Sequence, residues 1–319
     1  MRAELDRLKP LDRIEITTII DNYSDSLLKD TEIVTRGPHI IGDRISDDTL
    51  VAEHGLCLQI TGYLDGEKQS VLFDAGYSKI GVLHNLEYLG IDLNTIHTIV
   101  VSHRHMDHTA GLYALLDRVS GPVSLVVHPE AFRADRYMRQ DDGKLVRFPR
   151  ILARDKLADY NVNILESKNP VLIGDDTIGV TGEVERTTSF EKGMPNAFVE
   201  TNGNLEKDPV LDDQALILHL KNKGLVVISG CSHAGIINTV RHAMKLTGVQ
   251  RLHAVLGGFH LGGPAYEPIV GDTIAALRKM SPEVIVPMHC TGWSSIHQFA
   301  EAFPSGFLLN SVGSKYTLR

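Results

Sequence analysis

The segment Ser102–Gly111 reads SHRHMDHTAG and places four metal-binding side chains within six residues. It follows Thr98–Val101, a short run of β-branched residues that predicts a buried strand. Because residues i and i+2 of an extended segment point the same way, His103 and His105 can share one ion. Asp107 and His108, on the turn that follows, can face a second ion. Imidazole and carboxylate ligands suit zinc, manganese and iron, so we expect a metal centre here rather than surface histidines in a loop.

On both sides of this segment the chain alternates predicted strands and helices. Strand pairs followed by β-α-β units occur in each half, which favours a duplicated α/β sandwich. The predicted strands are 14–21, 55–64, 70–73, 98–101, 123–127, 215–220, 225–229, 252–256 and 283–287. The predicted helices are 80–89, 109–116, 236–246 and 272–280. The long polar connection 22–54 is unusual for a compact domain, and such loops are usually functional.

Composition narrows the class of partner. The chain of 319 residues has 32 Lys and Arg against 40 Asp and Glu, a net charge of −8, which argues against nucleic acid. We find no apolar run that resembles a signal peptide or a membrane span. The three cysteines form no disulfide framework, and their odd number suits a reducing compartment. We expect a cytoplasmic protein that acts on a small, anionic molecule and binds neither nucleic acid nor membrane.

A basic segment at about 132–156 departs from this acidic background. It holds 8 Lys or Arg and 4 Asp or Glu, a local balance of 8 − 4 = +4. We expect an exposed helical or loop insertion, which is either a solvated surface or a lid over an anionic substrate. Arg133, Arg136 and Arg139 recur every three residues, so on a helix they would form one face for phosphate. Arg133 and Arg136 are therefore candidate substrate-binding residues.

Two motifs carry a resemblance to the metallo-β-lactamase superfamily. The segment Ser102–Gly111 resembles the signature motif of that superfamily, and Leu72–Gly76 (LFDAG) resembles its first motif. The resemblance extends from Ile14 to the C-terminus and implies an αββα sandwich of two mixed β-sheets flanked by helices. It implies one domain over 1–319, with the basic segment as an insertion. It also implies that Asp74 supports the metal-binding loop from behind the ligands.

The resemblance supplies further ligands from later strand ends. An Asp or Cys binds the second ion where this chain has Cys231, and a thiolate would favour zinc over magnesium. The segment Val286–Gly292 resembles the final motif, with His289 as a ligand of the second ion. A histidine that normally completes the first ion has no counterpart in its usual context. Glu183 and His233 are the two candidates to replace it.

Two other histidines in that interval have structural interpretations. His128 ends a predicted strand before a proline, and His219 lies within the predicted strand Ala215–Leu220. A histidine satisfied by its surroundings is the better interpretation of each. We therefore leave the number and identity of the ions open.

Four phrases narrow the resemblance to one branch. This branch includes archaeal 7,8-dihydropterin-6-methyl-4-(β-D-ribofuranosyl)aminobenzene-5′-phosphate synthases, together with many metallo-hydrolases. The phrases are DNYS at 21–24, SGCSHAG at 229–235, GGFHL at 257–261 and PMHCTG at 287–292. Apart from the resemblance, Asn22, His260 and Trp293 are candidate substrate-binding residues. His260 follows a glycine pair that lets a ligand approach the backbone, and Trp293 can stack on a flat ring or pack in the core.

The resulting hypothesis is hydrolysis of a small ester, lactone, thioester or phosphoester by one or two zinc ions, with manganese or iron as alternatives. Asp107 would orient the nucleophilic water, and His260 would steady developing charge or the leaving group. The alternative is a transferase that uses a pterin diphosphate, like the synthases of that branch. A non-catalytic sensor that kept the fold is a third interpretation, because the usual histidine is missing. The sequence leaves the oligomeric state open.

Overall fold

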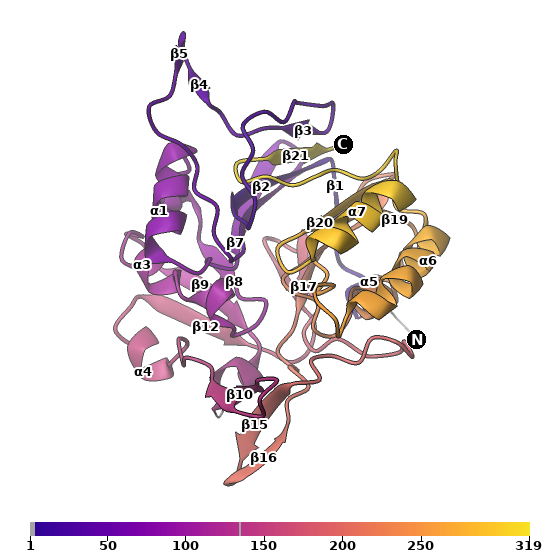
Figure 1. Cartoon of the computed structure of the whole chain (residues 1–319). Helices are drawn as coiled ribbons and strands as arrows, with labels where there is room; N and C mark the ends of the chain where they lie inside the picture. Colours follow the sequence, from indigo (N-terminus) through magenta and orange to yellow (C-terminus); the bar gives the residue numbers. More distant parts are fainter. Residues whose placement is uncertain (1–3, 134) are drawn as a thin grey trace.

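Two mixed β-sheets pack face to face in the computed structural model (Figure 1), which describes residues 4–133 and 135–319. The first sheet has the order β12 (Val162–Glu166), β9 (Val123–Val127), β8 (Thr98–Val100), β7 (Glu67–Phe73), β6 (Cys57–Leu64), β2 (Arg13–Ile20), β21 (Lys315–Leu318), β3 (Val34–Thr35). The second has the order β13 (Val171–Ile173), β14 (Ile178–Val180), β17 (Ala215–Leu220), β18 (Gly224–Ser229), β19 (Leu252–Gly258), β20 (Val284–Met288), with β1 (Pro10–Leu11) beside β17.

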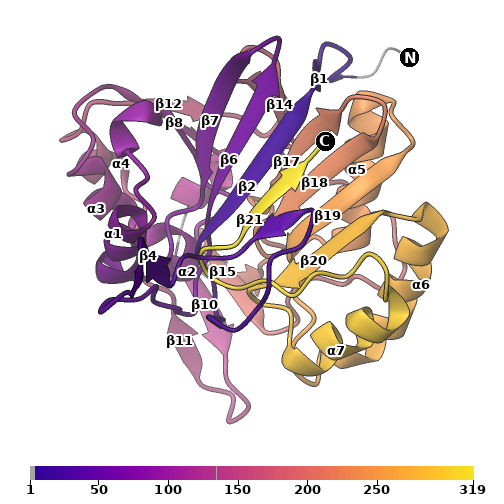
Figure 2. The same ribbon diagram turned by 90° about the horizontal axis from the view of Figure 1, so that it is seen from above.

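The helices cover the outer faces of both sheets (Figure 2). Those over the first sheet are α1 (Lys79–Tyr88), α3 (Leu112–Leu116) and α4 (Arg154–Leu157), and those over the second are α5 (Ile236–Thr247), α6 (Val270–Met280) and α7 (Trp293–Ala302). Apolar residues from the facing sides of both sheets form a shared core between them. Strand β18 is buried throughout, as expected for a strand covered on both faces. The predicted αββα sandwich is confirmed.

One predicted helix has different bounds. A helix was predicted over 109–116, but α2 (Met106–Thr109) begins three residues earlier and α3 follows it separately. Gly111 lies between them, and a Cβ atom there would stand 2.1 Å from the carbonyl oxygen of Ala75. The chain therefore passes the end of β7 so closely that only glycine fits at this position. The earlier start matters because it places Asp107 and His108 on a helical turn.

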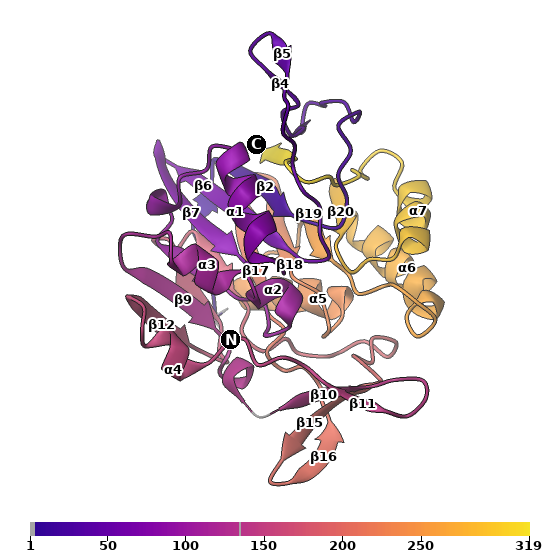
Figure 3. The ribbon, with the colours of Figure 1, turned by 60° about the vertical axis from the view of Figure 1, so that its left-hand side comes forward.

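The basic segment at about 132–156, predicted to be helical or loop, contains a β-hairpin that the sequence did not predict, followed by a loop and the helix α4 (Figure 3). Strands β10 (Arg136–Arg139) and β11 (Leu145–Arg147) pair antiparallel, and β10 also pairs with β15 (Ala197–Thr201), which pairs with β16 (Asn204–Lys207). This small sheet lies below the sandwich, opposite the projecting hairpin of β4 (Ile40–Ile41) and β5 (Arg44–Ile45). The described residues also form three short 3₁₀ helices, which are η1 (Leu93–Thr95), η2 (Pro129–Phe132) and η3 (Glu267–Ile269).

The predicted arginine face is wrong because successive side chains of a strand point to opposite sides. Arg136 is buried, and its guanidinium lies 2.6 Å from Asp212 and 2.8 Å from Asp208. Arg133, before β10, is about half exposed and pairs with Glu130 at 2.9 Å. Arg136 therefore anchors the insertion to the sandwich and is not available to a substrate.

Among the described residues, none of the helices has the length and apolarity needed to cross a bilayer.

We expect Arg136→Met to lower the free energy of unfolding by about 3–5 kcal/mol, because it leaves two buried carboxylates without their partner. Arg133→Met is the matched control, since its ion pair with Glu130 is exposed and should contribute less than about 1 kcal/mol. Urea unfolding followed by circular dichroism measures both. Equal, small losses in the two variants would contradict the anchoring role of Arg136.

Candidate metal centre

The metal-binding loop is fixed by one buried carboxylate. Asp74 follows β7 with a positive φ of 64°, and its side chain is fully buried. One carboxylate oxygen accepts the backbone N–H of Ser102 at 2.7 Å. The other accepts the Ser102 hydroxyl at 2.7 Å and the Nδ1–H of His108 at 2.6 Å. Asp74 therefore sets the tautomer of His108 and turns its Nε2 toward the site.

The first donor group joins three buried histidines from both sheets. His103 Nε2 lies 2.9 Å from His105 Nδ1, and His233 Nε2 lies 3.1 Å from each of these atoms. Burial holds the pKa of His103 and His233 well below its usual range and lowers that of His105 to about 3. The rings are therefore neutral at neutral pH. Three converging imidazole nitrogens at these spacings fit one tetrahedral ion with bonds of about 2.0–2.1 Å.

The second group contains Asp107, His108, Cys231 and His289. His108 Nε2 lies 3.1 Å from the Cys231 sulfur and 3.0 Å from His289 Nε2, which is 3.3 Å from Asp107 Oδ2. Burial acts to raise the pKa of Asp107, but His108 and His289 outweigh it and hold that pKa below its usual range. Burial and Cys290 raise the pKa of the Cys231 thiol. A cation held by this group would lower that pKa, because a coordinating thiol is deprotonated.

The two groups adjoin, since the rings of His103 and His108 are 4.3 Å apart between centroids. Burial acts to lower the pKa of His108, yet Asp74 and Asp107 raise it to about 9. An ion at Nε2 would take the place of that proton, because a ligating histidine is neutral. The residues therefore fit a pair of divalent ions held side by side.

The structure brings His233, and not Glu183, into the first group. His233 follows β18 through Ser232, which has a φ of 60° and donates its hydroxyl to the Gly258 carbonyl at 2.7 Å. Asp213 accepts the next N–H, that of Ala234, at 2.8 Å. Glu183 is exposed, because Gly182 before it adopts a φ of 64° and the chain turns toward Lys168.

The two histidines interpreted as structural lie outside both groups. His128 Nδ1 accepts the backbone N–H of Glu130 at 3.2 Å and caps η2. His219 lies in β17, between β1 and β18. Burial lowers the pKa of both rings.

The candidate substrate residues are spread around the centre. Asn22 donates its amide to the His289 carbonyl at 2.8 Å, so it supports the final motif. Trp293 is 66% exposed at the start of α7, 6.1 Å from the Tyr23 ring, which removes the core-packing interpretation. His260 has a φ of 48°, and its ring lies 4.3 Å from that of His233. Its Nδ1 is buried without a hydrogen-bond partner among the described residues.

Sequence reasoning missed two aromatic neighbours of the centre. His54 Nε2 lies 3.5 Å from Asp107 Oδ2, and its ring lies 5.1 Å from that of His289. Phe148, after β11, stacks on His105 at 4.8 Å with 16° between the rings. The available signals were the length of the 22–54 connection and the position of the insertion. Neither signal names a particular residue.

Comparison with known proteins places these motifs in a family. The metallo-beta-lactamase superfamily model matches residues 55–191. The 7,8-dihydropterin-6-methyl-4-(beta-D-ribofuranosyl)-aminobenzene-5'-phosphate synthase of Methanocaldococcus jannaschii is 30% identical over 80% of this chain and 87% of its own. An uncharacterised protein of the same organism is 31% identical over 86% and 97%.

Solved structures agree at the level of the fold. A metal-dependent hydrolase of the beta-lactamase superfamily has a TM-score of 0.69 at 24% identity, covering 96% of this chain and 98% of its own. A diphosphatase from the PhnP family has a TM-score of 0.50 at 13% identity, covering 97% and 98%. The 30% identical relative is named as a synthase, which confirms the prediction of an enzyme. The chain belongs to the metallo-beta-lactamase superfamily.

Proposed function

We propose that this chain is a metal-dependent hydrolase of a small ester, lactone, thioester or phosphoester. The observation that carries the proposal is the pair of adjoining donor groups, three histidines beside Asp107, His108, Cys231 and His289. We propose two ions, and zinc above manganese or iron, because one donor is a cysteine sulfur. When bound, such ions supply Lewis acidity and lower the pKa of water at the site.

The chain's own residues would orient the reactants. Asp107 is ionised, and its Oδ2 faces His289 at 3.3 Å and His54 at 3.5 Å, so it can accept a hydrogen bond from an attacking water. His260 borders the first group and can donate a proton to a leaving group. Phe148 covers one face of His105 and keeps solvent from it.

The proposal takes residues 1–319 as one domain, because each sheet supplies donors to both groups. We also propose that the protein is cytoplasmic. Cys57, Cys231 and Cys290 are free thiols in the described structure, and a reducing compartment keeps thiols free. An anionic small molecule is the proposed partner.

Transfer from a pterin diphosphate is the second candidate, favoured by the 30% identity to a named synthase. Initial rates on a panel of simple esters, lactones and phosphoesters separate the two functions. Water-dependent turnover that EDTA abolishes and zinc restores supports hydrolysis. Tight binding of a pterin diphosphate with no turnover of the panel would replace the proposal by transfer.

We expect purified protein to carry about two equivalents of zinc by ICP-MS, one for each donor group. Cys231→Ser and His289→Ala should each lower this to about one by removing a ligand of the second group. His233→Ala should deplete the first group, while Glu183→Gln, the control, keeps the wild-type content. Wild-type protein that takes up no metal on titration would overturn the metal centre.

His54→Ala should lower kcat about tenfold with little change in KM, because Asp107 loses the imidazole that orients its carboxylate; tenfold corresponds to about 1.4 kcal/mol. His54→Gln, which keeps an N–H donor, should recover part of the rate. His297→Ala, an exposed histidine of α7, is the control. Steady-state kinetics measure the effect. An unchanged kcat in His54→Ala would show that His54 does not orient Asp107 for the reaction.

A further inference from the structure

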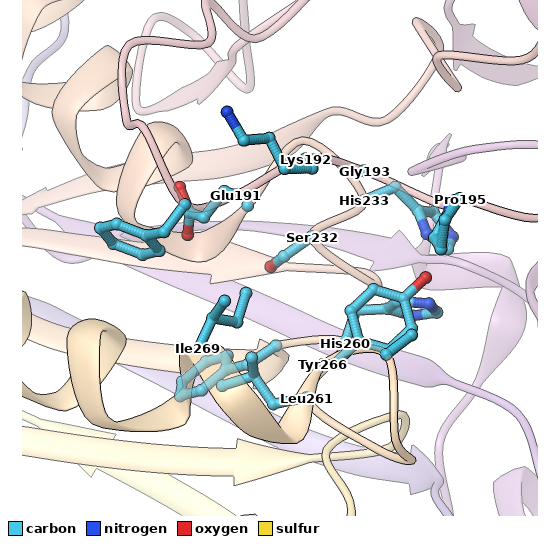
Figure 4. Close-up of a pocket in the computed structure, with 14 residues that line it drawn as sticks. Glu191, Lys192, Gly193, Pro195, Ser232, His233, His260, Leu261, Tyr266 and Ile269 are labelled. Carbon is cyan, nitrogen blue, oxygen red and sulfur yellow. The ribbon is translucent and has the colours of Figure 1, made fainter.

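A pocket of about 210 Å³ opens beside the first donor group (Figure 4). One wall is the segment 190–195, and the opposite wall is the segment 259–269. His233 and His260 lie together at one end, and Tyr266 packs its ring edge-on against His260 at 4.6 Å. The pocket therefore begins at the candidate metal centre and leads away from it.

Much of the pocket lining is apolar. Its lining includes Phe190, Phe259, Leu261 and Ile269. An apolar cavity of about 150 Å³ holds a benzene molecule, so the volume here admits one six-membered ring with a substituent. The two histidines lie at one end, and Lys192 lies on the upper wall, which gives a bound molecule a direction.

Two charged side chains, Glu191 and Lys192, line the pocket. Glu191 is buried, and its carboxylate is engaged by the backbone N–H groups of Ile237 and Asn238 at 2.8 and 2.9 Å. Lys192 is exposed and has no ion pair within the part of the chain that the structure describes. Lys192 lines the upper wall of the pocket, and Figure 4 shows its side chain extending upward from that wall. A ligand with a negative charge at this end would complement it.

We propose that Lys192 and Ile269 determine specificity for a substrate in which a flat ring separates the reacting bond from a negatively charged group. The ring lies against Ile269, the reacting bond faces His233 and His260, and the anionic group meets Lys192. This inference rests on the proposed function, because the reacting bond is placed by the metal centre.

Three inert phosphonates test the geometry on the metal-loaded protein by isothermal titration calorimetry. Methylphosphonate presents only the group that meets the centre, 4-methylphenylphosphonate adds the ring, and 4-carboxyphenylphosphonate adds the distal charge. Wild-type protein should bind 4-methylphenylphosphonate (the tolyl compound) at least about tenfold more tightly than methylphosphonate, because the ring is removed from water. The carboxylate of 4-carboxyphenylphosphonate should increase the affinity by a further factor of about three to ten.

The variants separate the contributions. Lys192→Ala should remove the advantage of the carboxylate and leave the tolyl compound unaffected, whereas Lys279→Ala, an exposed lysine of α6, should change neither. Ile269→Trp should fill the pocket and remove the advantage of the ring, with metal content and circular dichroism unchanged. Lys192→Glu should reverse the preference between the two aryl compounds.

The outcomes distinguish this inference from the proposed function. If all three phosphonates bind equally to a zinc-loaded protein, the pocket inference is overturned and the hydrolase proposal stands. If the aryl compounds bind through Ile269 and Lys192 to a protein that holds no zinc and hydrolyses nothing, the pocket is supported and the hydrolase proposal falls.

Discussion

The buried carboxylate of Asp74 is the constraint on which the centre depends. A charged group with no exposure to water is tolerated only when hydrogen bonds compensate it, and Asp74 receives three, from Ser102 and His108. These bonds tie the end of β7 to the loop after β8 and fix the turn that begins α2. Gly230 closes the arrangement from the second sheet, because a Cβ atom there would stand 2.2 Å from the Ser102 hydroxyl oxygen. These contacts hold the loop in the conformation that turns His108 toward the site.

Packing between the sheets sets the remaining distances. His103 and His105 come from the first sheet, whereas His233 follows β18 and His289 follows β20 of the second. The spacings near 3 Å across this boundary therefore depend on the shared apolar core, which includes Phe73 of the first sheet and Ile228 and Val286 of the second. A change in that core would be felt at the donors, since close-packed interiors transmit strain.

The sequence predicted the groups formed by residues that are close together in the chain. It left open the contacts between residues from distant segments. His103 to His108 lie in one short segment, so spacing and strand periodicity were enough to group them. His233 and Glu183 were equal alternatives, because the choice depends on which strand end meets the first sheet. Arg136 was misinterpreted because a three-residue spacing suits a helix, while pairing of β10 with β15, a tertiary fact, made the segment a strand. His54 joins the site through a long connection whose path no periodicity encodes.

The ion pairs made by the arginines of the insertion affect how an anionic substrate can be bound. Its basic balance suggested an arginine lid, yet Arg133 pairs with Glu130, Arg147 with Asp135, and Arg136 with Asp208 and Asp212. Arg139 lies over the Phe198 ring at 4.1 Å. A guanidinium already engaged gives up an existing partner when it binds a substrate, so its net contribution is small. Positive charge for an anionic substrate is then supplied by the metal centre and by a side chain that has no ion pair. The insertion contributes the ring of Phe148, which stacks on His105.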